Sequence, residues 1–86
     1  MEELEKGLNK FVGKDVEIEL EGFIEAMYKI EKLKYNIEHE ILNIVDKEQK
    51  AYIKVNINQI YDVKQQSENI KIYLDNDINV ILKIEF

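Results

Sequence analysis

Strict alternation of apolar and acidic residues over positions 15–21 is the feature that most constrains this chain. Val16, Ile18 and Leu20 are each flanked by two acids. Because successive side chains of a β-strand point to opposite faces, this period of two predicts a strand buried along one side only. Positions 78–86 alternate in the same way, with Ile81 as the exception. The pattern therefore favours amphipathic strands near both ends of the segment 15–86.

The first residues follow a different period. Leu4, Leu8, Phe11 and Val12 fall on one helical stripe, and acids occupy the first turn, where they oppose the positive helix end. We expect a helix over about 2–12, ended by Gly13 at the C′ position.

Residues 23–38 fit two patterns. Ile24 and Tyr28 belong to an alternating series, whereas Phe23, Met27 and Ile30 also fit one helical face. We favour two strands, near 23–30 and 33–38, over a helix spanning 23–34.

Beyond residue 40 the β pattern is stronger and the breaks are polar. The final strand is either paired inside a sheet or an open edge, which invites pairing with another subunit. The remaining expected strands lie at 41–45, 52–55, 60–63 and 70–74, with turns or loops at 46–50, 65–69 and 75–77, and a bend or single 3₁₀ turn at 56–59.

A chain of 86 residues provides one hydrophobic core, so we predict a single domain, 1–86. The predicted fold is mainly β: a short N-terminal helix followed by a small antiparallel barrel or curled sheet of about six or seven strands.

Composition excludes several classes of site. The chain has no cysteine, which excludes disulfides and thiolate metal sites. Its glycines are isolated, which excludes glycine-rich phosphate loops. It has no arginine, so bidentate binding of phosphate or carboxylate by a guanidinium group is excluded as well. The formal charge is −6, with eleven acids and six lysines in residues 1–40. Nucleic-acid binding is therefore not expected. The charged N-terminus and the lack of a long apolar run predict a cytoplasmic protein without membrane contact.

Candidate catalytic and metal-binding residues are few. His39 is the only histidine, flanked by Glu38 and Glu40, and we interpret it as a surface or edge residue. Residues 75–79 have the opening spacing of a calcium loop, but Val80 replaces the required glycine. Ser67 has no nucleophile-elbow motif around it. We expect no enzyme activity, no cofactor and no metal.

The acidic side of the first strand is the candidate partner-binding face. Period two places its carboxylates roughly 6.5–7 Å apart on one face, where they could dock a basic protein surface or remain solvated. The residues are Asp15, Glu17, Glu19, Glu21 and Glu25.

The tyrosines could form a stacking platform for bases or serve as strand residues at the core and its rim. We favour the second interpretation, because the chain is acidic. They are Tyr28, Tyr35, Tyr52, Tyr61 and Tyr73.

Residues 8–20, with glycine and lysine before an alternating strand, resemble the start of Sm-like proteins, and the resemblance covers residues 4–22. Residues 42–45 are similar to the Sm1 segment, and Ile53-Lys54 with Ile60-Tyr61 to the Sm2 segment, where Val55 replaces a glycine. The resemblance implies a five-stranded bent barrel that forms rings and often binds RNA.

We expect a non-catalytic protein-interaction or self-assembly module, which binds a protein partner or associates with itself. One alternative is an acidic inhibitor, such as phages encode, that mimics nucleic acid on a basic protein surface. The other is an Sm-like RNA-binding ring.

Overall fold

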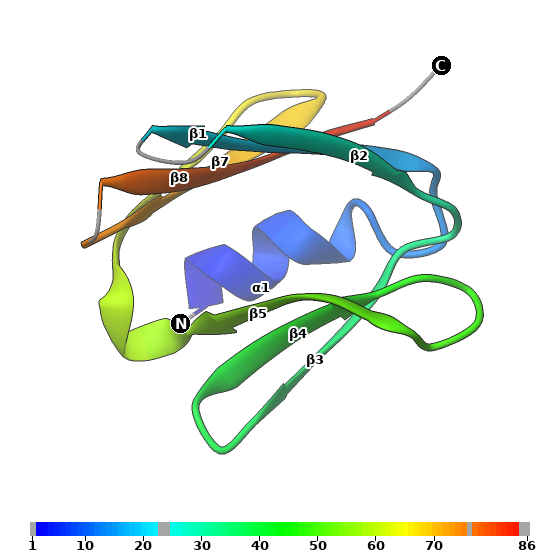
Figure 1. Cartoon of the computed structure of the whole chain (residues 1–86), viewed down its shortest axis with the longest axis horizontal. Coiled ribbons are helices and arrows are strands. Elements are labelled where there is room, and N and C mark those ends of the chain that lie inside the picture. Colours follow the sequence, from blue (N-terminus) through cyan, green and yellow to red (C-terminus); the bar gives the residue numbers. More distant parts are fainter. Residues whose placement is uncertain (1, 23–24, 76, 85–86) are drawn as a thin grey trace.

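The computed structural model describes residues 2–22, 25–75 and 77–84, and shows two antiparallel sheets with a helix between them (Figure 1). The mainly β fold with one N-terminal helix is therefore confirmed, with eight strands among the described residues. The elements are α1 (Glu2–Asn9), β1 (Val16–Gly22), β2 (Ala26–Ile30), β3 (Lys34–Glu38), β4 (Ile41–Val45), β5 (Ala51–Asn56), the 3₁₀ helix η1 (Ile57–Gln59), β6 (Ile60–Gln65), β7 (Asn69–Leu74) and β8 (Ile78–Ile84).

Strand order shows how the chain builds the two layers. The five-stranded sheet has the order β2-β1-β8-β7-β6, and the three-stranded sheet has the order β3-β4-β5. The chain passes between the layers twice, from β2 to β3 and from β5 through η1 to β6. Strand β8 lies between β1 and β7, so the described part of the C-terminal strand is paired inside the sheet rather than at an open edge.

The core lies between the sheets and includes one side of the helix. Leu4 and Leu8 of α1 and Phe11, which follows it, are fully or almost fully buried. They join one cluster with inward residues of both sheets, because period-two alternation directs those side chains toward each other. The sheet residues in this cluster include Val16, Ile18, Ile30, Leu42, Ile44, Ile53, Val55, Ile60, Ile70, Ile72, Val80 and Leu82.

The helix is shorter than the sequence predicts. It ends at Asn9, and hydrogen bonds from the Lys10 and Phe11 amides to Gly7 and Leu8 continue it as turns. Val12, the last residue of the expected apolar stripe, is 45% exposed, because the chain has left helical geometry before reaching it. Gly13 ends the turn with φ +79°.

Two strands, not a helix, occupy the described part of the ambiguous segment: β2 and β3. Phe23, Ile24 and Phe86 lie outside the described residues. The 3₁₀ turn expected at 56–59 is present as η1, where the Asn56 side chain accepts a hydrogen bond from the Asn58 amide.

The two hairpins of the three-stranded sheet have different turns. The β3–β4 turn consists of His39 and Glu40, both with positive φ, the conformation that two-residue hairpins prefer. The β4–β5 turn is organised by Asp46, whose Oδ1 accepts hydrogen bonds from the amides of Glu48 at 2.9 Å and Lys50 at 3.1 Å.

Candidate functional site

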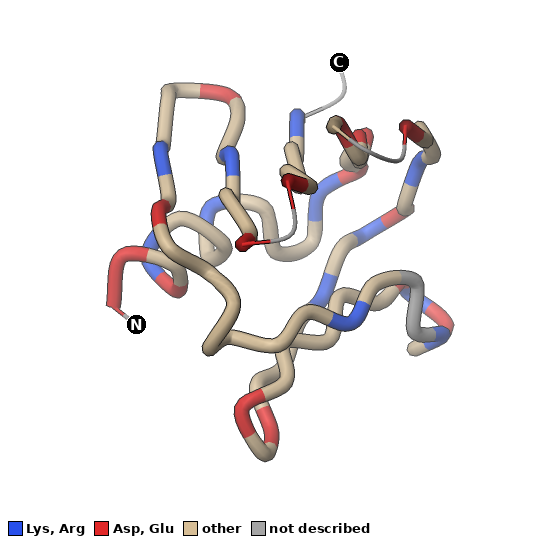
Figure 2. Tube along the Cα trace, turned by 60° about the vertical axis from the view of Figure 1, so that its left-hand side comes forward, with Lys and Arg blue, Asp and Glu red and all other residues tan. Residues whose placement is uncertain are grey.

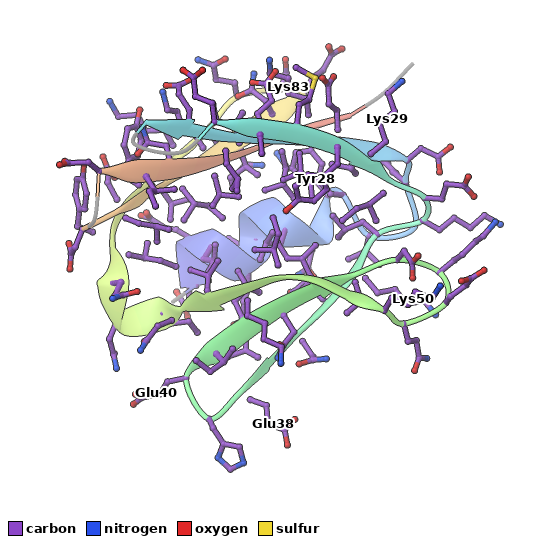
Figure 3. The ribbon with its side chains drawn as sticks, in the orientation of Figure 1. Tyr28, Lys29, Glu38, Glu40, Lys50 and Lys83 are labelled. Atoms are coloured by element: carbon purple, nitrogen blue, oxygen red, sulfur yellow. The ribbon has the colours of Figure 1, made fainter. Side chains whose placement is uncertain are left out.

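The outward side of the five-stranded sheet carries three rows of side chains, which together we call the outer face. Strand pairing places Lys29, Glu17, Lys83 and Asn69 in the first row; Met27, Glu19, Ile81, Lys71 and Lys64 in the second; and Glu21, Asn79, Tyr73 and Asp62 in the third. Figure 3 shows Lys29 and Lys83 on the side of this sheet that points away from the helix.

Charge on the outer face is sorted by strand. Strand β1 contributes the three acids Glu17, Glu19 and Glu21. The lysines come from the other four strands, and β6 also contributes an acid, Asp62; Figure 2 marks acids and lysines along the chain. Sequence patterning predicted the acidic row correctly as one side of a strand. The lysines opposite it come from segments much later in the chain.

Two of the acids on β1 are ion-paired within the molecule. Lys83 Nζ lies 3.2 Å from the Glu19 carboxylate, and Lys71 Nζ lies 3.2 Å from Glu21 Oε1. The hydrogen bond with Glu21 raises the pKa of Lys71. The candidate acidic face is therefore half of a mixed face, not an isolated acidic surface.

Ile81 interrupts the polar pattern of β8 and lies at the centre of the outer face. It is only 7% exposed, although it points away from the main core. Its register neighbours are Glu19 and Lys71, and Lys83 is two residues along its own strand. The long stems of charged side chains can cover apolar surface in this way, which explains the exception in the alternation.

The β6–β7 side of the outer face combines lysine with tyrosine. Lys64 and Lys71 are directly opposite in register, and their Nζ atoms lie 5.5 Å and 5.2 Å from the centroid of the Tyr73 ring. A shift of register between Ile60 and Asp62 places Tyr61 beside Tyr73, with ring centroids 5.9 Å apart. Like charges directly opposite each other are unfavourable in an isolated sheet.

The other two predicted acidic residues have different surroundings. Asp15 precedes β1, and its Oδ1 accepts a hydrogen bond from the Lys32 amide at 3.2 Å, at a turn where Lys32 has φ +50°. Glu25 lines a shallow pocket of about 350 Å³ with Glu21 and Met27 at the β1–β2 end of the outer face. Asp15 therefore supports a turn, and Glu25 extends the acidic side.

The tyrosines divide between the inside and the outside of the fold. Tyr28 is half-buried between the sheets, and burial raises its pKa. The Tyr35 hydroxyl donates to Asn9 Oδ1 at 2.8 Å and so connects β3 to the residue that ends α1. Tyr73 belongs to the outer face, Tyr61 lies beside it at the rim of that face, and the side chain of Tyr52 lies outside the described part. The core-and-rim interpretation therefore holds for Tyr28 and Tyr35.

Residues considered for catalysis or metal binding are dispersed. The His39 side chain is 91% exposed at the β3–β4 turn, as expected for a surface histidine. Asp77, in the rejected calcium-loop segment, has φ +57° in the β7–β8 turn. Within residues 2–22, 25–75 and 77–84, no group of three or more His, Asp or Glu side chains could hold a metal ion.

Comparison of the chain with family models, with curated proteins and with solved structures yields no match. The resemblance to Sm-like proteins therefore stays a prediction. Among the described residues, the structure has no helix with the length and apolar character needed to cross a membrane.

Proposed function

We propose that this protein is a non-catalytic protein-interaction module that binds its partner through the outer face of the five-stranded sheet. The observation that carries the proposal is the sorting of charge by strand, with three acids on β1 and lysines on the other four strands, of which only β6 also carries an acid, Asp62. Segregated charges of this kind favour partners of complementary pattern and disfavour others.

Apolar side chains at the rims of the outer face also support the proposal. Met27 on β2 is 63% exposed and Tyr61 on β6 is 65% exposed, and these are two of the three large hydrophobic residues exposed in the described chain. Methionine and tyrosine are both enriched where proteins meet. The face thus offers apolar contacts on both sides of a charged centre.

The ion pairs favour this function over mimicry of nucleic acid. A mimic presents a uniformly negative surface, but Lys83 and Lys71 lie 3.2 Å from the carboxylates of Glu19 and Glu21 on this same face. A partner that carries both signs of charge matches the outer face better than a uniformly basic one.

The proposal is tested by reversing charge on the outer face and asking whether partner capture is lost. A face variant, Glu17→Lys/Glu19→Lys/Glu21→Lys, is compared with a control, Glu38→Lys/Glu48→Lys/Glu68→Lys, which makes the same change of charge elsewhere. Light scattering measures self-association, and affinity capture identifies other partners.

We expect the wild type and the control to retain the same partner and the face variant to lose it, with both variants folded by circular dichroism. Equal binding by the folded face variant would overturn the proposal. A wild type that is strictly monomeric and captures nothing would overturn it too.

A further inference from the structure

We infer that the partner of the outer face is a second copy of this chain, related by a two-fold axis that runs parallel to the strands and passes over β8. The inference rests on the proposed function, since it names the partner of that same surface. Its basis is that this one rotation brings Glu19 of each copy over Lys71 of the other.

Two-fold rotation about an axis along β8 exchanges the β2 edge of the sheet with the β6 edge. Each row keeps its position along the strands. Strand β1 of one copy then lies over β7 of the other, so Glu19 faces Lys71 of the second copy, and the same pair forms again by symmetry. An axis in the sheet plane but perpendicular to the strands would place β1 over β1 and acid over acid. The sorted charges therefore select the first arrangement.

The residues nearest the axis are compatible with this contact. Ile81 in the central row lies opposite Ile81 of the second copy, so the residue nearest the axis is apolar. Lys83, also on β8, approaches its own symmetry mate, but its charge is offset by Glu19 at 3.2 Å. Protein interfaces are usually more apolar at the centre than at the rim, and the position of Ile81 agrees with that.

The rims of the outer face also pair across the axis. Met27 on β2 comes over Lys64 on β6 of the second copy, because both residues belong to the second row. The second copy also supplies acids near the directly opposed Lys64 and Lys71, which are unfavourable in the isolated sheet. The contact thus places an acid, Glu19, over one member of the lysine pair, Lys71.

The test is a charge exchange measured by sedimentation velocity on the full chain. The variants are Glu19→Lys, Lys71→Glu, an equimolar mixture of these two single variants, and the double variant on one chain. In the proposed dimer each single reversal creates two repulsive pairs, whereas the mixture and the double variant restore opposite charges at both positions. The control is Glu38→Lys with Lys54→Glu, on the three-stranded sheet.

We expect a concentration-dependent dimer for the wild type and the control, at least about a tenfold rise in Kd for each single variant, and recovery in the mixture. Higher salt should weaken the wild-type dimer, which provides a readout free of substitutions. If the double variant does not fold, the mixture decides, because each of its chains carries only one change.

A wild type that stays monomeric up to about 1 mM would overturn the inference, since that limit corresponds to about 4 kcal/mol of binding free energy. Single variants that dimerise as tightly as the wild type, or a mixture that fails to recover, would do the same. The proposed function would survive any of these results if charge reversal on the outer face still abolished capture of a different protein.

Discussion

At the scale of single residues, Gly7 shows how closely the helix packs on the five-stranded sheet. It lies on the buried side of α1, and a Cβ at this position would overlap Cδ1 of Ile70 on β7. Ile70 is itself fully buried, so its side chain has little room to move away. Glycine is a poor helix former, and here close packing accounts for its presence.

Gly7→Ala is predicted to destabilise the protein by about 1 kcal/mol, because overpacking outweighs the gain in helix propensity. Ile70→Val removes the overlapping Cδ1 atom and should itself cost about 0.5–1.5 kcal/mol. In the Ile70→Val background, Gly7→Ala should become neutral or stabilising. Urea unfolding of the four proteins measures the coupling, and strictly additive effects would contradict the close contact.

The raised pKa of Tyr28 predicts how the stability of the fold changes at alkaline pH. Burial raises its pKa in the folded protein, while the unfolded chain keeps the ordinary tyrosine value near about 10. The unfolded state therefore loses this proton first, so stability is unaffected well below pH about 10 and falls as pH rises toward the folded pKa.

Tyr28→Phe should reduce the slope of stability against pH above about 10 and leave the slope at neutral pH unchanged. Some alkaline loss should persist, because the pKa values of Tyr35, Lys47 and Lys71 are also raised. Thermal unfolding at a series of pH values measures both slopes. Identical alkaline slopes for the two proteins would show that Tyr28 does not contribute.

At the scale of elements, the end of β1 is held against the β7–β8 turn by Gly22. This residue has φ +123° and pairs with Ile78, and a Cβ on it would overlap the carbonyl oxygen of Asp77. The overlapping atom belongs to the backbone, which cannot rotate away as a side chain can. Sequence patterning could not reveal which strand approaches Gly22.

Gly22→Ala is predicted to destabilise the protein by more than about 2 kcal/mol, since it combines an unfavourable φ with a backbone clash. Gly13→Ala is the matched control, because Gly13 also has positive φ but a Cβ added there would meet no atom within 4 Å. It should cost only about 1 kcal/mol. Equal losses in denaturant unfolding would show that the contact with Asp77 is unimportant.

The strands that the sequence predicted best are those in which one face is buried and the other is charged. Period two identified Val16 and Ile18 of β1 and Val80 and Leu82 of β8 as inward residues, although Ile81 between the last two is buried as well. It left residues 23–34 undecided, because Ile30 fits both the alternating series and the helical face that contains Met27, and only pairing of β2 with β1 favours the strand. The helical period also overextended the helix to Val12, since Phe11 remains buried after the helix has ended.

At the scale of the whole molecule, sequence patterning predicted the row of acids on β1 but not the lysines that pair with them. Glu19 and Lys83 are 64 residues apart in the chain, and Glu21 and Lys71 are 50 apart. Those pairs depend on β8 lying between β1 and β7, which hydrophobic patterning does not determine. The acidic face predicted from β1 alone thereby became one half of a charge-sorted surface.

The same arrangement shows which part of the surface carries the net negative charge. The chain carries a formal −6, yet the three rows of the outer face contain four lysines and four acids. Most of the excess negative charge therefore lies elsewhere, where it favours solubility. The outer face remains close to neutral, which is suited to a partner that carries both signs of charge.

The most direct test of the outer face as the binding surface is a map of backbone amide chemical shifts as the protein concentration rises from about 20 µM to about 1 mM, a range that covers weak association. If the chain stays monomeric, the same spectra are recorded with its captured partner. We predict changes concentrated at outward positions of β1, β7 and β8, with Ile81 among the largest. Changes centred on β3, β4 and β5, or none under either condition, would contradict binding through the outer face.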